Sequence, residues 1–348
     1  MFARYWHKLP SLVRFTARRL LAGVLLCVGV TLISFILTQV VPGDPITAAL
    51  GDRAAGDPAI VAAFRSHYGL DKPLPEQYVI YLAHVMQGDL GQSQQSRRPV
   101  TTDLAQYLSA TIELAIVAML AAMLVGVSLG IVAAVYREKW PDQVVRVISL
   151  AGVSVPTFWL GLICLYIFFF KLGISPGVGR LSPGVATPPS VTGLITIDAV
   201  LSGQWTVLWD ALSHLALPAM VLAIYTVGSV TRFTRAAMLD SLSQDYVRAA
   251  RAKGLLPRTV LLRHALRPAL AAIITVLGMA FGRMLGGAVL VESVFSWPGI
   301  GEYAYRSALS LDLPGIMGVS LVIAVIYILV NLVIDILYAV IDPRVRLA

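Results

Sequence analysis

Charged residues are scarce in this chain. Only 13% of its 348 residues are Asp, Glu, Lys or Arg, whereas 57% are hydrophobic. A soluble domain carries about 25% charged residues, so this composition is not that of an ordinary soluble protein. Cysteine is scarcer still, because Cys27 and Cys164 are the only two and both lie in apolar stretches. Two such cysteines predict neither a disulfide framework nor a metal site.

Motifs for catalysis and nucleotide binding are missing as well. The chain has no Gly-x-x-x-x-Gly-Lys-Ser/Thr phosphate loop, no His-Glu-x-x-His and no Cys-x-x-Cys. Its five histidines are scattered along the sequence. We therefore predict no catalytic residue, no metal site and no enzymatic activity in this chain. If the protein moves a solute uphill with nucleotide energy, another subunit must supply the ATPase.

Long apolar stretches are what the chain has instead. About 20 residues at 1.5 Å rise cross a hydrocarbon core of ~30 Å, so several runs of this length favour a membrane protein over a soluble one with buried helices. The sequence predicts a single all-α transmembrane domain over residues 1–348. Its six predicted spans are residues 20–41, 114–136, 147–170, 215–231, 269–290 and 315–340.

Lysine and arginine residues gather on one set of loops, which orients the predicted spans. They concentrate in the N-terminal segment, the turn after the second span, the loop 232–267 and the tail. Basic loops remain in the cytoplasm, so both termini and this loop are predicted to be cytoplasmic, with the chain in the inner (cytoplasmic) membrane. The net charge of +8 is typical of nucleic-acid-binding proteins too, but these charges sort by membrane side, so no nucleic-acid partner is predicted.

The opposite side of the membrane would hold three longer loops, of which residues 42–103 are the first. The basic N-terminus lacks a small-residue cleavage pattern, so the first span is predicted to be retained rather than removed as a signal peptide. Trp205, Trp209 and Trp297 are expected in the aromatic belt at the membrane surface. Pro156 is expected to kink the third span.

The loop 232–267 contains a short basic segment rich in alanine. Residues 241–253 are predicted to form a helix, with Asp245 in an early turn and Gly254 as a left-handed C-terminal cap. Its basic residues lie towards the C-terminal end, where they suit the helix dipole: Arg248, Arg251 and Lys253.

One face of this predicted helix carries small residues. Leu242, Tyr246, Ala249 and Ala250 recur at helical spacing, and alanines there would let another surface approach closely. From the spacing alone, a second interpretation is equally open, in which the helix lies on anionic lipid at the membrane surface.

A resemblance to a known family favours the interpretation in which this helix contacts another protein surface. Ala249, Ala250 and Gly254 match the Ala-Ala-x-x-x-Gly of the cytoplasmic loop of ABC-importer permeases, although Arg248 stands where the general pattern has Glu. This substitution and the His-Ala-Leu-Arg at residues 264–267 resemble the oligopeptide/dipeptide branch. Further motifs of this branch occur in order at residues 41–45, 68–73, 88–91, 295–301 and 342–344.

The resemblance extends over nearly the whole chain, and it implies the type I ABC importer permease fold with six spans. The long loop after the first span resembles that of the first of two permease subunits. The implied partners are a second homologous permease, two ATPase subunits that bind ATP and Mg, and an extracytoplasmic solute-binding protein. The chain itself would need no cofactor, and residues 245–254 would dock on an ATPase. Peptides or similar small solutes are the expected substrates, with nickel, opines, glutathione or sugars as alternatives.

Three ionisable residues fall in or near the predicted spans: Glu113, Arg283 and Asp335. A charge at the centre of a span costs roughly 2.5–3.5 kcal/mol on insertion scales and usually faces a protein interior or a watery path. Arg283 is the deepest, and the resemblance implies an uncharged residue there. We hypothesise that it lines the translocation path and favours a carboxylate or phosphate. The alternative is a structural ion pair with an acid such as Glu113 or one on the partner permease.

Two other functional classes fit the sequence less well. A secondary transporter or channel acting alone would need coupling-ion or selectivity groups within the membrane, and few are available. It would also leave the segment 245–254 without a role. A membrane enzyme would need a cluster of catalytic residues, which the sequence lacks.

Overall fold

Long helices dominate the computed structural model, which describes residues 11–40 and 57–341. Within this part of the chain, five helices are long and apolar enough to cross a membrane, and the number rises to six if one bent helix pair forms a single span. The five are α2 (Ser11–Val40), α6 (Val100–Val135), α10 (Trp205–Ser243), α13 (Arg267–Val294) and α15 (Leu313–Ile341). The prediction of an all-α membrane protein is confirmed. The helices are longer than the predicted spans, which cover only their apolar parts.

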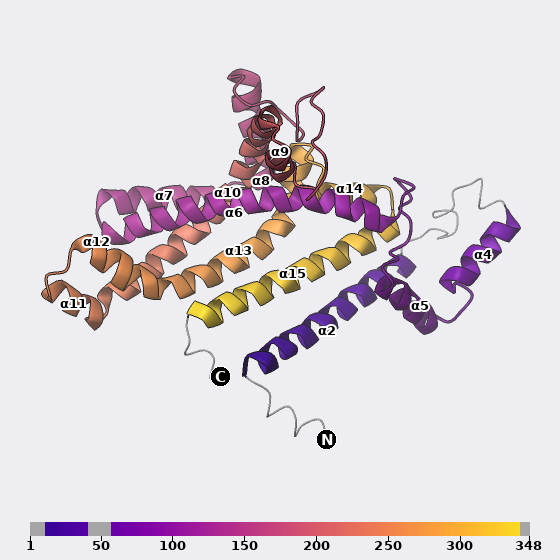
Figure 1. The fold of residues 1–348 in the computed structure, drawn as a ribbon, viewed down its shortest axis with the longest axis horizontal. Helices are drawn as coiled ribbons and strands as arrows, with labels where there is room; N and C mark the ends of the chain where they lie inside the picture. The colour runs from indigo at the N-terminus through magenta and orange to yellow at the C-terminus, as the bar shows by residue number, and fades with distance from the viewer. Residues whose placement is uncertain (1–10, 41–56, 342–348) are drawn as a thin grey trace.

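The third predicted span is broken. It consists of α7 (Trp140–Ser154), α8 (Thr157–Cys164) and the π-helix η1 (Leu165–Lys171), and its two halves meet at 101°. The kink predicted at Pro156 is confirmed. Proline lacks a backbone N–H and disfavours helical geometry in the residue before it, and Val155 is indeed extended at φ −88° and ψ 126°. As a result α8 projects sideways from the bundle (Figure 1).

Shorter helices lie outside the spans. The segment predicted as a long loop, 42–103, contains α4 (Pro58–Tyr68), α5 (Leu74–Met86) and the start of α6, while residues 41–56 lie outside the described part. The remaining short helices are α9 (Ile195–Leu201), α11 (Asp245–Ala252), α12 (Pro257–Thr259) and α14 (Ile300–Leu309), with the π-helix η2 (Val260–Leu266).

The two ends of the bundle carry different elements. In Figure 1, α11 and α12 lie at one end of the molecule, and α4, α5 and α14 lie towards the other. The first described residues of α2 and the last of α15 both point towards the α11 end. The basic terminal residues on which the predicted orientation partly depends, such as Arg4 and Arg344, lie outside the described residues.

Close approach of α6 and α10 forms the centre of the bundle, and these two helices share the most extensive contact. Gly126 and Gly130 make it possible. A Cβ at Gly130 would lie 2.5 Å from Thr234 Cβ and 2.8 Å from the carbonyl oxygen of Thr231. Small residues four apart let helix backbones approach closely where a membrane offers little hydrophobic driving force.

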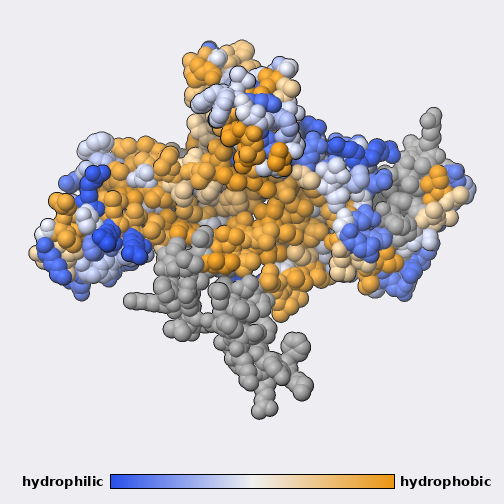
Figure 2. All heavy atoms as spheres, viewed as in Figure 1, coloured by the Kyte–Doolittle hydropathy of each residue, from blue (hydrophilic) through white to orange (hydrophobic). Residues whose placement is uncertain are grey.

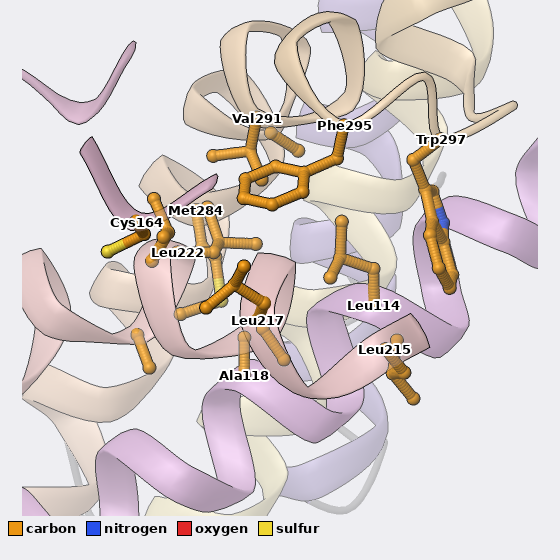
Figure 3. Close-up of a cluster of buried hydrophobic side chains, with 14 of the residues drawn as sticks. Leu114, Ala118, Cys164, Leu215, Leu217, Leu222, Met284, Val291, Phe295 and Trp297 are labelled. Atoms are coloured by element: carbon orange, nitrogen blue, oxygen red, sulfur yellow. The ribbon is translucent and has the colours of Figure 1, made fainter. Parts of the chain in front are cut away.

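The main apolar core lies beside this contact. Figure 3 shows Leu114 of α6, Leu215 of α10 and Val291 of α13 packed together with Phe295 and Trp297. Trp297 is only 1% exposed, and its Nε1–H donates to the carbonyl oxygen of Ala110 at 2.9 Å. Its expected place in the aromatic belt is therefore wrong, because its indole fills the core and is satisfied there. Trp205 and Trp209 are exposed, as a belt requires.

A hydrophobic band crosses the middle of the molecule on the face shown in Figure 2. Figure 2 shows apolar residues across the central part of this face and polar residues at both ends. Large apolar side chains on α2 and on α8–η1, such as Leu25 and Phe170, are exposed in the single chain. An apolar belt between polar ends is the arrangement that a bilayer requires.

Candidate coupling segment and membrane cavity

The basic, alanine-rich segment forms a separate short helix at one end of the bundle. The prediction of one helix over 241–253 is wrong, because α10 runs to Ser243 and α11 begins at Asp245. The chain turns at Gln244, whose ψ of 150° is extended. The break contains neither glycine nor proline, so the sequence carries no local signal for it.

Two side chains anchor α11 to the rest of the protein. Val247 and Ala250 are buried at 0% and 5% exposure, and they pack against Val260 with Leu242 beside them. The face predicted from Leu242, Tyr246, Ala249 and Ala250 is therefore only partly correct. The inward face of the helix is rotated from the predicted one, because Gln244 interrupts the helix between Leu242 and α11. Val247 therefore faces inward.

The opposite face of α11 is open to solvent. The exposed residues of α11 are Asp245, Tyr246, Arg248, Ala249, Arg251 and Ala252, and Lys253 just beyond its end is exposed as well. Arg248 donates to the carboxylate of Asp245, and both side chains are largely exposed, so this ion pair adds little stability. The result is a basic surface with alanine at its centre, which a partner can approach closely.

Gly254 ends the helix in the left-handed conformation that the sequence predicts. Its φ is +74°, and the amide of Leu255 donates to the carbonyl oxygen of Ala250 at 3.4 Å. Left-handed geometry is readily adopted by glycine and strained for β-branched residues. No atom lies within 4 Å of where a Cβ would stand, so the space beside Gly254 is empty in the single chain.

Hydrogen bonds connect α11 to the spans. Ser241, near the end of α10, donates its hydroxyl to the carbonyl oxygen of Ala265 at 2.7 Å and lies 3.0 Å from the hydroxyl of Tyr246. The end of α10, the start of α11 and η2 are thereby held together, so a displacement of α11 acts on both α10 and α13.

A buried ion pair holds α10 beside the start of α7. Arg235 donates to the two carboxylate oxygens of Asp142 at 2.7 and 2.8 Å, and Asp142 is fully buried. Arg146 approaches the same carboxylate at 3.8 Å. The sequence reasoning did not single out this pair. Asp142 follows Pro141 at a helix start. This position indicates a structural role for the acid but does not identify the residue with which it pairs.

Glu113 is occupied by other groups. Its side chain is 4% exposed, pairs with Arg180, and accepts from the amide and hydroxyl of Thr196 at 2.8 and 2.6 Å. The interpretation of Glu113 as the ion-pair partner of Arg283 is therefore wrong. Asp335 lies in α15, but its side chain is outside the described residues.

Arg283 lies on the wall of a cavity between α8, α10 and α13. The volume of this cavity is about 250 Å³. Its polar lining comes from Thr157, Tyr225, Thr226, Ser229 and Arg283. Within the described part of the chain, no group of three or more His, Cys, Asp or Glu residues could hold a metal ion.

Comparison with known proteins matches both halves of the chain. Residues 126–347 match the family described as binding-protein-dependent transport system inner membrane component, and residues 12–115 match its N-terminal membrane component. The resemblance to ABC-importer permeases of the peptide branch is thereby confirmed.

Individual relatives cover nearly the whole chain. It is 47% identical to the probable D,D-dipeptide transport system permease protein of Escherichia coli strain K12, over 92% of this chain and 94% of that protein. It is 43% identical to the di/tripeptide transport system permease protein of Pseudomonas aeruginosa strain UCBPP-PA14, over 96% and 99%.

A solved structure shares the fold. The inward-facing MetNI methionine ABC transporter matches with a TM-score of 0.51 at 14% identity, over 69% of this chain and 96% of that chain. The candidate membrane spans, the exposed short helix at one end and these matches all indicate the same family. The chain belongs to the family of binding-protein-dependent transport system inner membrane components, and it is a permease subunit in the inner membrane.

Proposed function

We propose that this chain forms half of the translocation path of an ATP-driven importer for peptides or similar small solutes. The other half would be a second, homologous permease. The observation that carries this proposal is α11, a short helix anchored by Val247 and Ala250 and exposed on its opposite face. A protein that only spans a bilayer has no need of such a helix, whereas one driven by a soluble partner does.

Energy would enter through this helix. We propose that two ATPase subunits bind ATP and Mg, and that one of them receives the surface formed by Tyr246, Arg248, Ala249, Arg251 and Lys253. The empty space beside Gly254 leaves room for a close approach. Because Ser241 connects α11 to η2, closure of the ATPases would shift α10 and α13 together and switch the side to which the path opens.

The sides of the membrane follow from the charge distribution. Basic loops remain in the cytoplasm, so the α11 end would face the ATPases inside the cell. The end that carries α4, α5 and α14 would face outward, where an extracytoplasmic solute-binding protein would deliver the substrate.

Peptides are favoured as substrates because the relatives described above are named for dipeptide and tripeptide transport. Nickel, opines, glutathione and sugars remain alternatives within the same family. A secondary transporter acting alone would leave the exposed face of α11 without a role.

Replacing Gly254 tests the proposed coupling. Valine at φ +74° is strained, and its branched side chain would occupy the empty space beside α11. In proteoliposomes containing both permeases, both ATPases and the binding protein, we expect Gly254→Val to lower ATP hydrolysis stimulated by the binding protein about tenfold or more, or to release the ATPases. The spans should remain inserted.

Gly203 provides a matched control for backbone strain. It ends α9 with φ +68°, and the amide of Gln204 donates to the carbonyl oxygen of Ala199, which is the same cap that Leu255 and Ala250 form. No atom lies within 4 Å of its Cβ position either. Gly203→Val should therefore assemble and couple normally. Equal coupling in both variants would show that the segment after α11 has no part in energy transfer.

A further inference from the structure

The cavity within the spans combines a mostly apolar wall with a few polar groups that can bind an anion. Arg283 and Gly287 line it from α13, one helical turn apart, and Tyr225, Thr226 and Ser229 line it from α10. The α10 residues share one helix face because they are spaced three and four apart. A guanidinium and several hydroxyls thus converge on one space of about 250 Å³ between helices that are otherwise apolar.

Arg283 lies deep within its helix. At 1.5 Å per residue it is about 24 Å along the axis from Arg267, where α13 begins, and about 16 Å from Val294, where the helix ends. Arginine at such depth usually faces a protein interior or a watery path and has a counter-charge. Arg283 is therefore expected to have a negatively charged partner.

No acidic side chain of the described residues pairs with Arg283. Glu113 is held by Arg180 and Thr196, and Glu292 accepts from the hydroxyl of Thr111 and the amide of Glu302. The hydrogen bonds and ion pair of these two carboxylates hold loops against the bundle.

Asp335 of α15 is the remaining acid in a neighbouring helix, and its side chain lies outside the described residues. A Cβ at Gly282, the residue before Arg283, would lie 2.9 Å from the ring of Tyr327, which fixes the register of α13 against α15. Tyr327 precedes Asp335 by about two helical turns, or roughly 12 Å. The described side chains therefore supply no counter-charge for Arg283, which leaves it available to a charge from outside the chain.

We propose that Arg283 binds the C-terminal carboxylate of the transported peptide within the membrane. This inference rests on the proposed function of the chain as a peptide importer. The planar guanidinium donates two parallel hydrogen bonds to a carboxylate, and the hydroxyls of Thr226 and Ser229 offer further donors on the facing helix. Gly287 keeps the wall beside Arg283 free of a side chain.

The charge of this site also selects against other cargo. A guanidinium without a counter-charge repels metal cations, so the site disfavours nickel among the alternative substrates. A neutral sugar would leave the guanidinium without a counter-charge at membrane depth, which is unfavourable.

Uptake of paired peptides by the complete reconstituted transporter tests the proposal. A dialanine with a free C-terminus and its C-terminally amidated form would be compared in wild type, Arg283→Ala and Arg283→Lys. The same binding protein serves every variant, so its own preference cancels in the comparison. We expect Arg283→Ala to lower uptake of the free peptide about tenfold or more, in line with the loss of a charge-assisted hydrogen bond, and to leave the amidated peptide within about twofold.

The other variants separate the possible causes. Arg283→Lys should recover part of the uptake of the free peptide, because it keeps the charge but not the planar fork. Arg137→Ala, which removes an exposed arginine outside the spans, should change neither peptide. Equal losses for both peptides in Arg283→Ala would overturn the proposal and indicate an ion pair with the partner permease. Unchanged uptake of both would overturn it as well. A wild-type complex that imports neither peptide would refute the proposed function itself, and this inference with it.

Discussion

Single buried carboxylates hold the loops of this protein against its helices. Asp198 is 2% exposed and accepts from the amide and hydroxyl of Thr192, both at 2.7 Å, and from the amide of Gly193 at 3.0 Å. Burial by itself raises the pKa of this carboxyl, but the hydrogen bonds together outweigh it and hold the pKa below its usual value. Asp198 therefore stabilises the fold in its ionised form.

The stability contributed by Asp198 should depend on pH. Because its pKa is lower in the folded state, the contribution is complete above the usual carboxyl pKa of about 4 and is lost as the pH falls through the lowered value. We expect Asp198→Asn to lower the Tm of the detergent-solubilised protein at pH 7, and the difference from wild type to shrink towards pH 3. A difference that stays constant over this range would contradict the assigned ionised role.

The sequence predicts the roles of individual residues less completely than it predicts the helices. The left-handed Gly254 is visible in the sequence because a glycine follows a helical alanine-rich segment. The burial of Trp297 and the ion pair of Glu113 with Arg180 are not visible, because their partners lie far away in the sequence and become neighbours only through packing.

At the scale of elements, helix contacts depend on small residues. The GxxxG pattern of Gly126 and Gly130 brings α6 against α10, and this pattern is visible in the sequence. The number of spans and the kink at Pro156 were predictable from apolar length and proline chemistry. The start of α11 was not, because Gln244 is an ordinary helix residue whose turn is imposed by the packing of Val247 on Val260.

Adding one methyl group to α6 should separate it from α10. The new Cβ of Gly130→Ala would stand 2.5 Å from Thr234 Cβ and 2.8 Å from a backbone carbonyl oxygen, so one helix must move. We expect a loss of about 1–3 kcal/mol in unfolding free energy, as for other overpacked cores. Gly29→Ala in α2 is the matched control, since nothing lies within 4 Å of its Cβ position. Thermal unfolding in detergent measures both, and equal values for the two variants would contradict the proposed close contact.

At the scale of the whole molecule, energy input and substrate binding occupy different places along the same helices. The α11 surface lies at one end, and the cavity with Arg283 lies within the spans, between α10 and α13. Both helices are connected to α11 through Ser241, Ala265 and η2. A movement at α11 can therefore reach the cavity without passing through flexible segments.

Photo-crosslinking from α11 tests the central claim most directly. A p-benzoylphenylalanine in place of the exposed Ala249, in the assembled transporter, should crosslink this chain to an ATPase subunit. The same residue in place of Leu309, which is 70% exposed on α14 towards the other end of the molecule, should not. An ATPase adduct is expected from position 249 alone. An intact complex that gives no ATPase adduct from position 249, or equal adducts from both positions, would contradict it.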